Sequence, residues 1–278
     1  MALPFATPAS LSPSFVLSYC EAGDVDQLCN VYYEAFKEDP GNSHWWSPSR
    51  DKMMAWMRTR IEKKMADRSI RHFKVTDVAS GDMVAFARWD IPEGSEHFGG
   101  WLGDCSSSNS SSGNDGAAVA AAAAVNVTKI VESEPSPQDA EQESQEVAAS
   151  APSVEQQVVD VPEGADPFLA LNFFGALKKA SAQWYKSDML GLSLISTDPK
   201  YHRRGAAKAL IVPMLELADS HGITAYLEAT PAGKPVYEKL GFRQVDSLDF
   251  NLQELTKGNL DGWYRLSIMT REPRAKPQ

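Results

Sequence analysis

The sequence has little of what secreted, membrane-spanning or nucleic-acid-binding proteins depend on. Its 278 residues include three cysteines, an odd number without a framework spacing, which argues against a disulfide-stapled secreted protein. No apolar run reaches the roughly 20 residues that a transmembrane helix needs. The first residues are rich in Pro and Ser and carry no basic segment of the kind that opens a signal peptide. We therefore expect a cytoplasmic location, with the nucleus left open, and no membrane partner.

A basic surplus is also missing, since 27 Lys and Arg stand against 37 Asp and Glu. The acidity is local: residues 102–166 hold twelve acidic residues and one basic residue, a net charge of −11 that leaves +1 for the rest of the chain. This stretch combines a Ser/Gly run, an Ala run and a Glu/Gln/Ser/Pro run, which cannot bury enough apolar surface to offset the entropy of ordering. We expect a disordered acidic insert there, either an inert spacer or a tract that acts on a charged substrate, and no nucleic-acid partner.

Outside the insert the composition is that of a folded domain, with 43% hydrophobic residues and seven tryptophans in the whole chain. Alternating and helical apolar periodicities predict a mixed α/β fold, with a mostly antiparallel sheet flanked by helices. We expect one domain over 15–270, with flexible tails at 1–14 and 271–278. The expected strands are 15–20, 71–76, 83–89, 189–196, 223–229, from 242 on, and 263–269; the expected helices are 25–36, 50–66, 167–185, 202–220 and 234–240.

The most informative stretch runs from Met189 to Leu217 and reads as a buried strand, a turn and an amphipathic helix. The helix opens with small residues, Gly205, Ala206 and Ala207, so a ligand can approach its backbone closely. Unpaired N–H groups and the positive end of the helix dipole suit a phosphate or pyrophosphate at this point. Arg203 and Arg204 stand at the end of the helix that repels cations, which makes sense if an anion docks there.

This stretch resembles motif A of the GNAT-type N-acetyltransferases, which have Gln/Arg-x-x-Gly-x-Gly/Ala between a strand and a helix. Here the pattern falls on His202-x-x-Gly205-x-Ala207, and His202 departs from the family. A second segment, Leu227–Thr230 followed by Tyr237–Phe242, resembles motif B of the same family. The likeness is loose over 15–100 and close over 189–243. It implies the GNAT-like acyl-CoA N-acyltransferase fold.

The resemblance also implies a function, the direct transfer of an acetyl group from acetyl-CoA to a primary amine, without a metal. Leu194, Ile195 and Ser196 are expected to hold the pantetheine arm through their backbone groups. The pyrophosphate would lie against Arg203, Arg204, Gly205, Ala206, Ala207 and Lys208, and Thr230 completes the expected acetyl-CoA site. The alternative for one of the two arginines is a solvated surface position. The chemical nature of the amine acceptor is not readable, and the protein is expected to be a monomer or a homodimer.

Two residues are candidate catalysts. In the family a tyrosine at the position of Tyr237 lies near the coenzyme sulfur, and a phenol suits protonation of a departing thiolate. Glu228, at the end of a strand, is the candidate base, directly or through water. The alternatives are that Tyr237 is a core residue and Glu228 an ion-pair partner. If neither acts, the chain is a non-catalytic CoA-binding sensor or protein-interaction module.

The acceptor side is less well marked. The expected hairpin ends in Arg88, Trp89 and Asp90, on a strand that in the resembled family faces the acceptor; the alternative is simple strand packing with the charges turned to solvent. Trp45 and Trp46 follow a helix-breaking Asp-Pro-Gly-Asn cluster and would either line an acceptor pocket or anchor the core.

Overall fold

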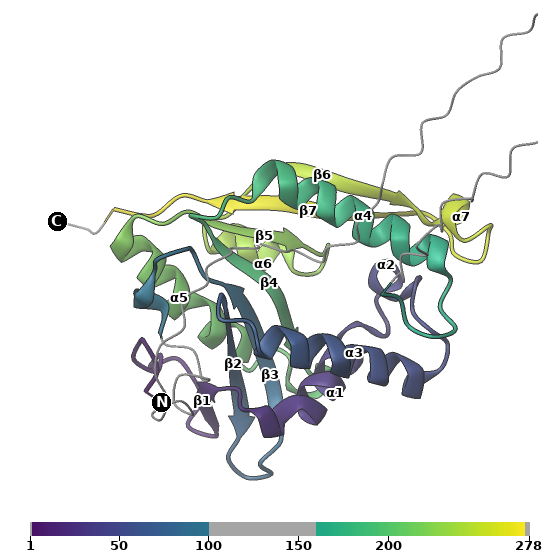
Figure 1. The fold of residues 1–278 in the computed structure, drawn as a ribbon. Coiled ribbons are helices and arrows are strands. Elements are labelled where there is room, and N and C mark those ends of the chain that lie inside the picture. Colours follow the sequence, from purple (N-terminus) through teal and green to yellow (C-terminus); the bar gives the residue numbers. More distant parts are fainter. Residues whose placement is uncertain (1, 100–159, 276–278) are drawn as a thin grey trace, which may run out of the picture.

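The computed structural model describes residues 2–99 and 160–275, which form a seven-stranded sheet with helices on both faces (Figure 1). The strand order is β1-β2-β3-β4-β5-β7-β6, and each neighbouring pair is antiparallel except the parallel pair β4 and β5. The strands are β1 (Phe15–Tyr19), β2 (Ile70–Asp77), β3 (Met83–Asp90), β4 (Leu190–Thr197), β5 (Ala225–Ala229), β6 (Arg243–Asn251) and β7 (Trp263–Arg271). The mixed, mostly antiparallel α/β fold expected from the sequence is confirmed.

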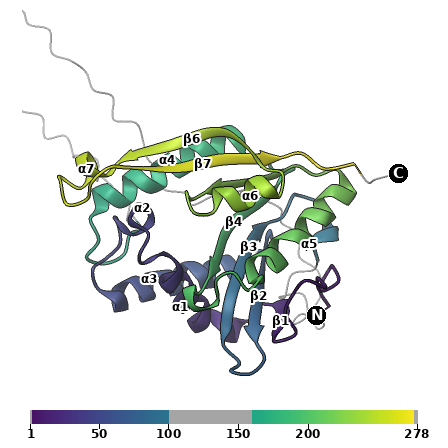
Figure 2. The same cartoon turned by 180° about the vertical axis from the view of Figure 1, so that it is seen from behind.

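Two helical layers cover the sheet, with α1, α3 and α4 on one face and α5 with α6 on the other (Figure 2). The helices are α1 (Val25–Phe36), α2 (Pro40–Ser43), α3 (Arg50–Met65), α4 (Pro167–Trp184), α5 (Ala206–His221), α6 (Lys234–Lys239) and α7 (Leu252–Leu255). Short 3-10 turns are η1 (Ala22–Asp24), η2 (Glu96–Phe98) and η4 (Pro199–Tyr201). Each long helix and each strand in the described residues lies where the sequence pattern placed it, within a few residues.

Strand alternation divides the buried side chains between these two layers. On β3, Ala87 and Trp89 pack in the core on the α5 face, whereas Phe86 packs with α1, α3 and α4. Arg88 and Asp90 follow Phe86 at steps of two, so they share its face of the sheet. Trp89 is therefore buried on the opposite face, as the strand-packing alternative proposed, and does not face the acceptor side.

The N-terminal residues differ from the expected flexible tail. Leu11 is buried, and Leu3 and Phe5 pack against the core on the α5 face. The Phe5 ring lies 5.4 Å from the ring of Phe73 on β2. The composition of this segment, rich in Pro and Ser, led to the expectation of a flexible tail. Its three apolar side chains nevertheless pack against the core.

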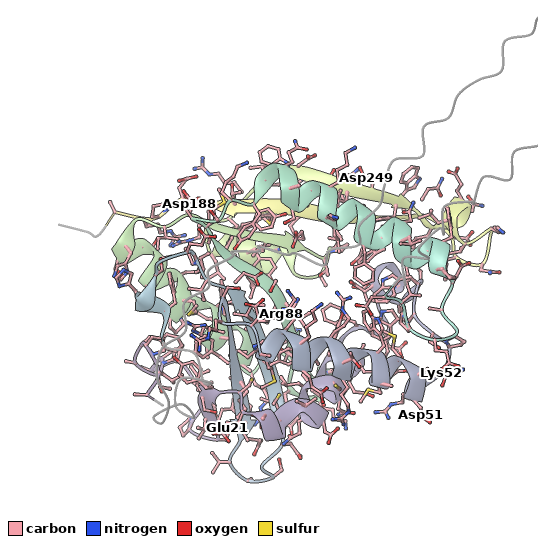
Figure 3. The ribbon with its side chains drawn as sticks, in the orientation of Figure 1. Glu21, Asp51, Lys52, Arg88, Asp188 and Asp249 are labelled. Carbon is pink, nitrogen blue, oxygen red and sulfur yellow. The ribbon has the colours of Figure 1, made fainter. Side chains whose placement is uncertain are left out.

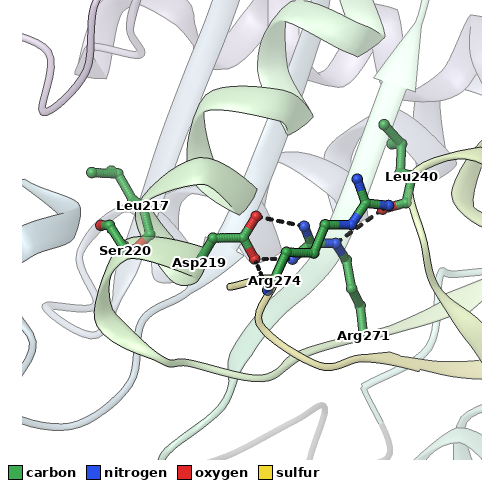
Figure 4. A network of polar contacts seen from close by, with 6 residues as sticks. All are labelled: Leu217, Asp219, Ser220, Leu240, Arg271 and Arg274. Carbon is green, nitrogen blue, oxygen red and sulfur yellow. Dashed lines mark hydrogen bonds and ion pairs between the residues drawn. The ribbon is translucent and has the colours of Figure 1, made fainter. Parts of the chain in front are cut away.

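The C-terminal residues are also anchored, by Asp219 near the end of α5 (Figure 4). Arg271 donates from its two Nη atoms to the two Asp219 oxygens at 2.7 Å, and the backbone N–H of Arg274 donates to the same carboxylate at 2.7 Å. Both arginines also donate to the carbonyl oxygen of Leu240 at 2.9 Å. Burial raises the pKa of Asp219, but these hydrogen bonds outweigh it and lower the pKa overall. The network ties α5, α6 and β7 together.

Most of the expected insert, 102–159, lies outside the described residues. Its last part, 160–166, is described and packs against α3, which the composition did not suggest. Asp160 accepts hydrogen bonds from Trp56 Nε1 at 2.9 Å and from Arg60 at 2.6 Å, and Asp166 caps the start of α4. The described residues that follow the gap therefore pack against the domain from Asp160 on, seven residues before α4.

Candidate active site

The site begins where β4 and β5 separate. These parallel strands pair over three residues, from Leu190 opposite Ala225 to Leu192 opposite Leu227. Beyond them β4 stays paired with β3, while β5 stays paired with β7. No described strand therefore pairs with residues 194–196 on the β5 side, and their backbone groups there are available to a ligand.

A cavity of about 1110 Å³ passes through this opening. Near the start of α5 it is lined by Ala207, Thr230, Gly233 and Tyr237. On the other face of the sheet its lining comes from α1, α3 and α4 and from Arg88, Asp90 and Glu228 on the strands. One cavity therefore joins the two faces of the sheet at the gap between β4 and β5.

The start of α5 is left open by its capping residue. Gly205 has a φ of 89° and no side chain, whereas Asp39, Ser49 and Asp166 close the first turns of α2, α3 and α4 with side-chain oxygens. A φ in this range favours glycine, because other residues meet a steric penalty there. The first N–H groups of α5 thus remain available for an anion, as the glycine pattern predicted.

The structure gathers part of the predicted site. The cavity lining includes seven of the predicted residues: Leu194, Ile195, Ser196, Ala207, Glu228, Thr230 and Tyr237. It does not include Arg203, Arg204, Gly205, Ala206 and Lys208, of which all but the buried Ala206 are exposed at the surface. The guanidinium of Arg204 lies over the rings of Phe15 (4.6 Å) and Tyr201 (5.2 Å). Its charge is thus directed toward β1.

Two hydroxyl groups of the cavity lining, those of Ser196 and Thr230, differ in their contacts. Ser196 is 2% exposed, and its Oγ has no hydrogen-bond partner among the described residues. A buried hydroxyl without a partner is costly, so a ligand that bonds it is favoured. Thr230 instead uses its Oγ1 to accept from the N–H of Gly233 at 3.1 Å, which fixes the turn before α6.

Glu228 lies at the opening, and its carboxyl has a strongly altered acidity. Burial raises its pKa to about 7; a hydrogen bond from the Tyr226 hydroxyl opposes the rise, and the nearby Asp90 adds to it. The Tyr226 hydroxyl donates to Oε1 of Glu228 at 2.7 Å. A carboxyl with this pKa exchanges a proton near neutral pH, as a general base needs to do.

Tyr237 combines the two expected alternatives, because it is a core residue and a cavity residue. It is 7% exposed and its ring lies 5.8 Å from that of Phe242 in an edge-on contact. Its hydroxyl has no hydrogen-bond partner among the described residues. Burial raises its pKa well above the usual value, so the phenol keeps its proton. A Cβ on Gly233 would lie 3.0 Å from this ring, which explains the glycine there.

On the acceptor side the paired tryptophans do not line the cavity. Trp45 is 1% exposed and packs with Phe173 and Phe174, as the core alternative proposed. The neighbouring helix α3 supplies Trp56 to the lining instead. Arg60 lies over the Trp56 ring at 4.6 Å, with its guanidinium bound to Asp160.

Three further lining residues were not predicted. Tyr226 stands two residues before Glu228 on one strand, so their shared face was readable from alternation. Ser193 is left unpaired at a register shift, since Arg88 pairs with Leu194 and Trp89 with Leu192. Neither this bulge nor the arrival of Tyr185 from the end of α4 has a local sequence signal.

Within 2–99 and 160–275, no group of three or more His, Cys, Asp or Glu side chains is arranged to hold a metal ion. The helices of these residues include none with the length and apolar character to cross a bilayer.

Comparison with known proteins gives a family match for part of the chain and a set of structures with a similar fold. No curated protein matches the chain. Its fold is similar to solved structures of the histone acetyltransferase HPA2 and related acetyltransferase from Corynebacterium glutamicum (19% identity, TM-score 0.49, 95% of this chain and 99% of that chain) and the ribosomal-protein-S18-alanine N-acetyltransferase from Escherichia coli (14%, 0.45, 95% and 97%). Another is the PaiA N-acetyltransferase from Thermoplasma acidophilum in complex with coenzyme A (12%, 0.42, 93% and 99%). Residues 168–251 match the family model described as an acetyltransferase (GNAT) domain. Over residues 168–251 the chain is therefore similar to a GNAT acetyltransferase domain.

Proposed function

We propose that this chain transfers the acetyl group of acetyl-CoA directly to a primary amine. The observation that carries the proposal is the single cavity at the gap between β4 and β5, with Glu228 and Tyr237 both in its wall. We propose further that residues 15–270 act as one domain, because the described elements of both halves share one sheet.

The donor side has groups suited to each part of acetyl-CoA. Residues 194–196 offer backbone groups along an unpaired strand edge to the pantetheine arm, and Ser196 offers a buried hydroxyl. The open first turn of α5 offers N–H groups to the pyrophosphate, with Arg203 and Lys208 exposed beside it. Thr230 lies in the wall, and its hydroxyl accepts from the N–H of Gly233.

Glu228 and Tyr237 would handle the protons of the transfer. Glu228 takes a proton from the acceptor ammonium, directly or through water, and the freed nitrogen attacks the thioester carbonyl carbon. The new C–N bond forms as the C–S bond breaks, and Tyr237 gives its proton to the departing thiolate; the nitrogen loses its second proton to solvent, and solvent returns a proton to Tyr237. Its raised pKa ensures that this proton is present when sulfur leaves.

The cysteines support direct transfer over an acetyl-cysteine intermediate. Cys20 and Cys29 are buried in the core between the sheet and helices α1, α3 and α4, and neither lines the cavity. Burial raises the pKa of Cys29 to about 11, so its thiolate is scarce at neutral pH. Cys105 lies outside the described residues.

A test measures acetyl-CoA consumption against a panel of primary amines, for the parent and for Tyr237→Phe. General acid catalysis contributes about 10²–10⁴-fold, so turnover should fall by that order while coenzyme A affinity stays unchanged. Tyr264→Phe is the matched control, because Tyr264 is equally buried but lies outside the cavity lining and bonds Asn42. It should lower stability and spare turnover.

Two outcomes would contradict the proposal in different ways. Unchanged turnover in Tyr237→Phe would remove this residue from the mechanism. Coenzyme A binding without acetylation of any amine by the parent would favour the non-catalytic sensor.

A further inference from the structure

Arg88 is a charged residue of the cavity that acetyl transfer itself does not use. It lies on the face of β3 toward α1, α3 and α4, near the centre of the molecule (Figure 3). Its Nε donates to Ser193 Oγ at 2.9 Å, and Nη2 approaches the Ser193 carbonyl oxygen at 3.4 Å. Within the described part of the chain, this guanidinium forms no ion pair with any carboxylate.

The groups around Arg88 do not neutralise it by contact. His72, directly opposite on β2, is buried, and this burial with the nearby Arg88 and Lys64 lowers its pKa to about 3. It is therefore neutral at physiological pH. Asp90 lies two residues along the same strand and pairs with Gly191; burial lowers the pKa of Arg88 and the charge of Asp90 opposes this, but no ion pair joins the two residues. A half-buried cation without a contacting anion is costly, and an anionic ligand group would remove that cost.

The position of Arg88 relative to Glu228 limits what such a ligand can be. The two residues stand on β3 and β5, with β4 between them, so their backbones are at least about 10 Å apart. Their side chains line the same cavity over the point where β4 and β5 part. A compact ligand placed over β4 can therefore meet both, with a positive group at Glu228 and a negative group at Arg88.

Helices α3 and α4 add aromatic side chains to the lining of the same cavity. They are Trp56, Phe173 and Phe174, which stand beside the charged lining residues Lys64 and Lys178. Arg60, which lies over the Trp56 and Phe174 rings at 4.6 and 5.2 Å, is already bound to Asp160. The aromatic part of the lining thus suits an apolar or aromatic group.

We propose that the acceptor is a zwitterionic primary amine, an α-amino acid with a large apolar side chain, whose carboxylate binds Arg88. This inference rests on the proposed acetyl transfer for the role of the amine. The amino group lies at Glu228, and the side chain lies against Trp56 and Phe174. A zwitterion brings no net charge into the cavity and supplies one partner for each of these two charged residues.

The test compares amino acids with the amines that lack the carboxylate: phenylalanine with phenethylamine, tryptophan with tryptamine, and leucine with isoamylamine. The parent should have a higher kcat/KM for each amino acid than for the corresponding amine. Arg88→Gln should lower kcat/KM for the amino acids by about 10²-fold, and change that for the amines less than about 3-fold. The ratio of kcat/KM for an amino acid to kcat/KM for its matched amine, measured within one variant, does not change if part of the protein is unfolded. Arg265→Gln, on a largely exposed arginine paired with Asp249, should leave both members of each pair unchanged.

Calorimetry with the same compounds on the coenzyme A complex provides a readout that needs no turnover. Tighter binding of the amino acids, lost in Arg88→Gln, supports the carboxylate site even if no acetylation occurs, in which case the proposed function fails alone. Acetylation of the amines with no preference for the amino acids overturns this inference and leaves the proposed function standing. Absence of both turnover and binding for every amino acid overturns it as well.

Discussion

The hydrogen bond from Tyr226 to Glu228 allows the acidity of the proposed base to be changed without removing it. Tyr226→Phe deletes the hydroxyl that donates to Glu228 Oε1 at 2.7 Å and keeps the ring beside Tyr185. This bond favours the charged carboxylate and opposes the rise that burial causes. Its loss should therefore raise the pKa of Glu228 further.

The size of the shift follows from the strength of the bond. A hydrogen bond to a charged group contributes about 1.5–3 kcal/mol, and one pKa unit corresponds to about 1.36 kcal/mol. Because the neutral carboxyl also accepts this bond, though more weakly, we expect a shift of about one unit, from about 7 to about 8. At pH 7 the fraction of enzyme with an ionised Glu228 would then fall about fivefold.

The assay is the pH dependence of kcat/KM with one acceptor, whose own titration is common to all variants. The acidic limb of the parent should lie near pH 7, and Tyr226→Phe should move it upward by about one unit. Tyr185→Phe is the control, because the Tyr185 hydroxyl bonds the Met189 carbonyl oxygen and not Glu228. A limb that stays in place in Tyr226→Phe, or that moves equally in Tyr185→Phe, would refute the assignment of this limb to Glu228.

Three further results are expected. The Glu228 pKa lies above its usual 4.5, so its contribution to stability is full below pH 4.5 and is lost as pH rises through about 7. Glu228→Gln should remove this loss. In denaturant titrations, its unfolding free energy should therefore gain up to about 3 kcal/mol relative to the parent between pH 4.5 and 8. Gly205→Glu and Gly222→Glu place the same residue at the two ends of α5, both with positive φ, so both should lose about 1–2 kcal/mol of stability, but calorimetry should show weaker coenzyme A binding in Gly205→Glu alone. Asp219→Ala leaves the 3%-exposed Arg271 side chain without its carboxylate and should lower the unfolding free energy by about 3–5 kcal/mol, whereas Asp249→Ala, beside an exposed arginine, should cost at most about 1 kcal/mol.

Much of the fold was readable from the sequence because its signals are local. The 3.6-residue stripe and helix-starting residues located α1, α3, α4 and α5, and alternation with turn residues located the strands. The chain ends were misread for a related reason. Arg271 and Arg274 are held by Asp219, about 50 residues away, and composition carries no trace of such a contact.

In the candidate site too, the local features could be predicted from the sequence and the long-range contacts could not. Backbone features followed from sequence: the strand at 189–196 was predicted from its buried character, and the helix start with Gly205 from a six-residue pattern. Side-chain directions did not follow. Arg204 was expected at the start of α5 and instead lies over Phe15 of β1, a residue far earlier in the chain. The choice between Trp45 and Trp56 as a cavity residue likewise depends on how α3 and α4 pack.

The bulge at Ser193 in β4 lies between the two parts of the proposed site, the opening for acetyl-CoA and the acceptor pocket. At Ser193 the register with β3 shifts by one residue, and the pairing with β5 ends one residue earlier, at Leu192. A bulge bends a strand and redirects the side chain at the extra residue. Here the bend accompanies the gap that exposes residues 194–196 to the donor, and the redirected Ser193 Oγ accepts from Arg88 on the acceptor side. The opening for acetyl-CoA and the orientation of the proposed carboxylate-binding arginine thus depend on the same residue of the sheet.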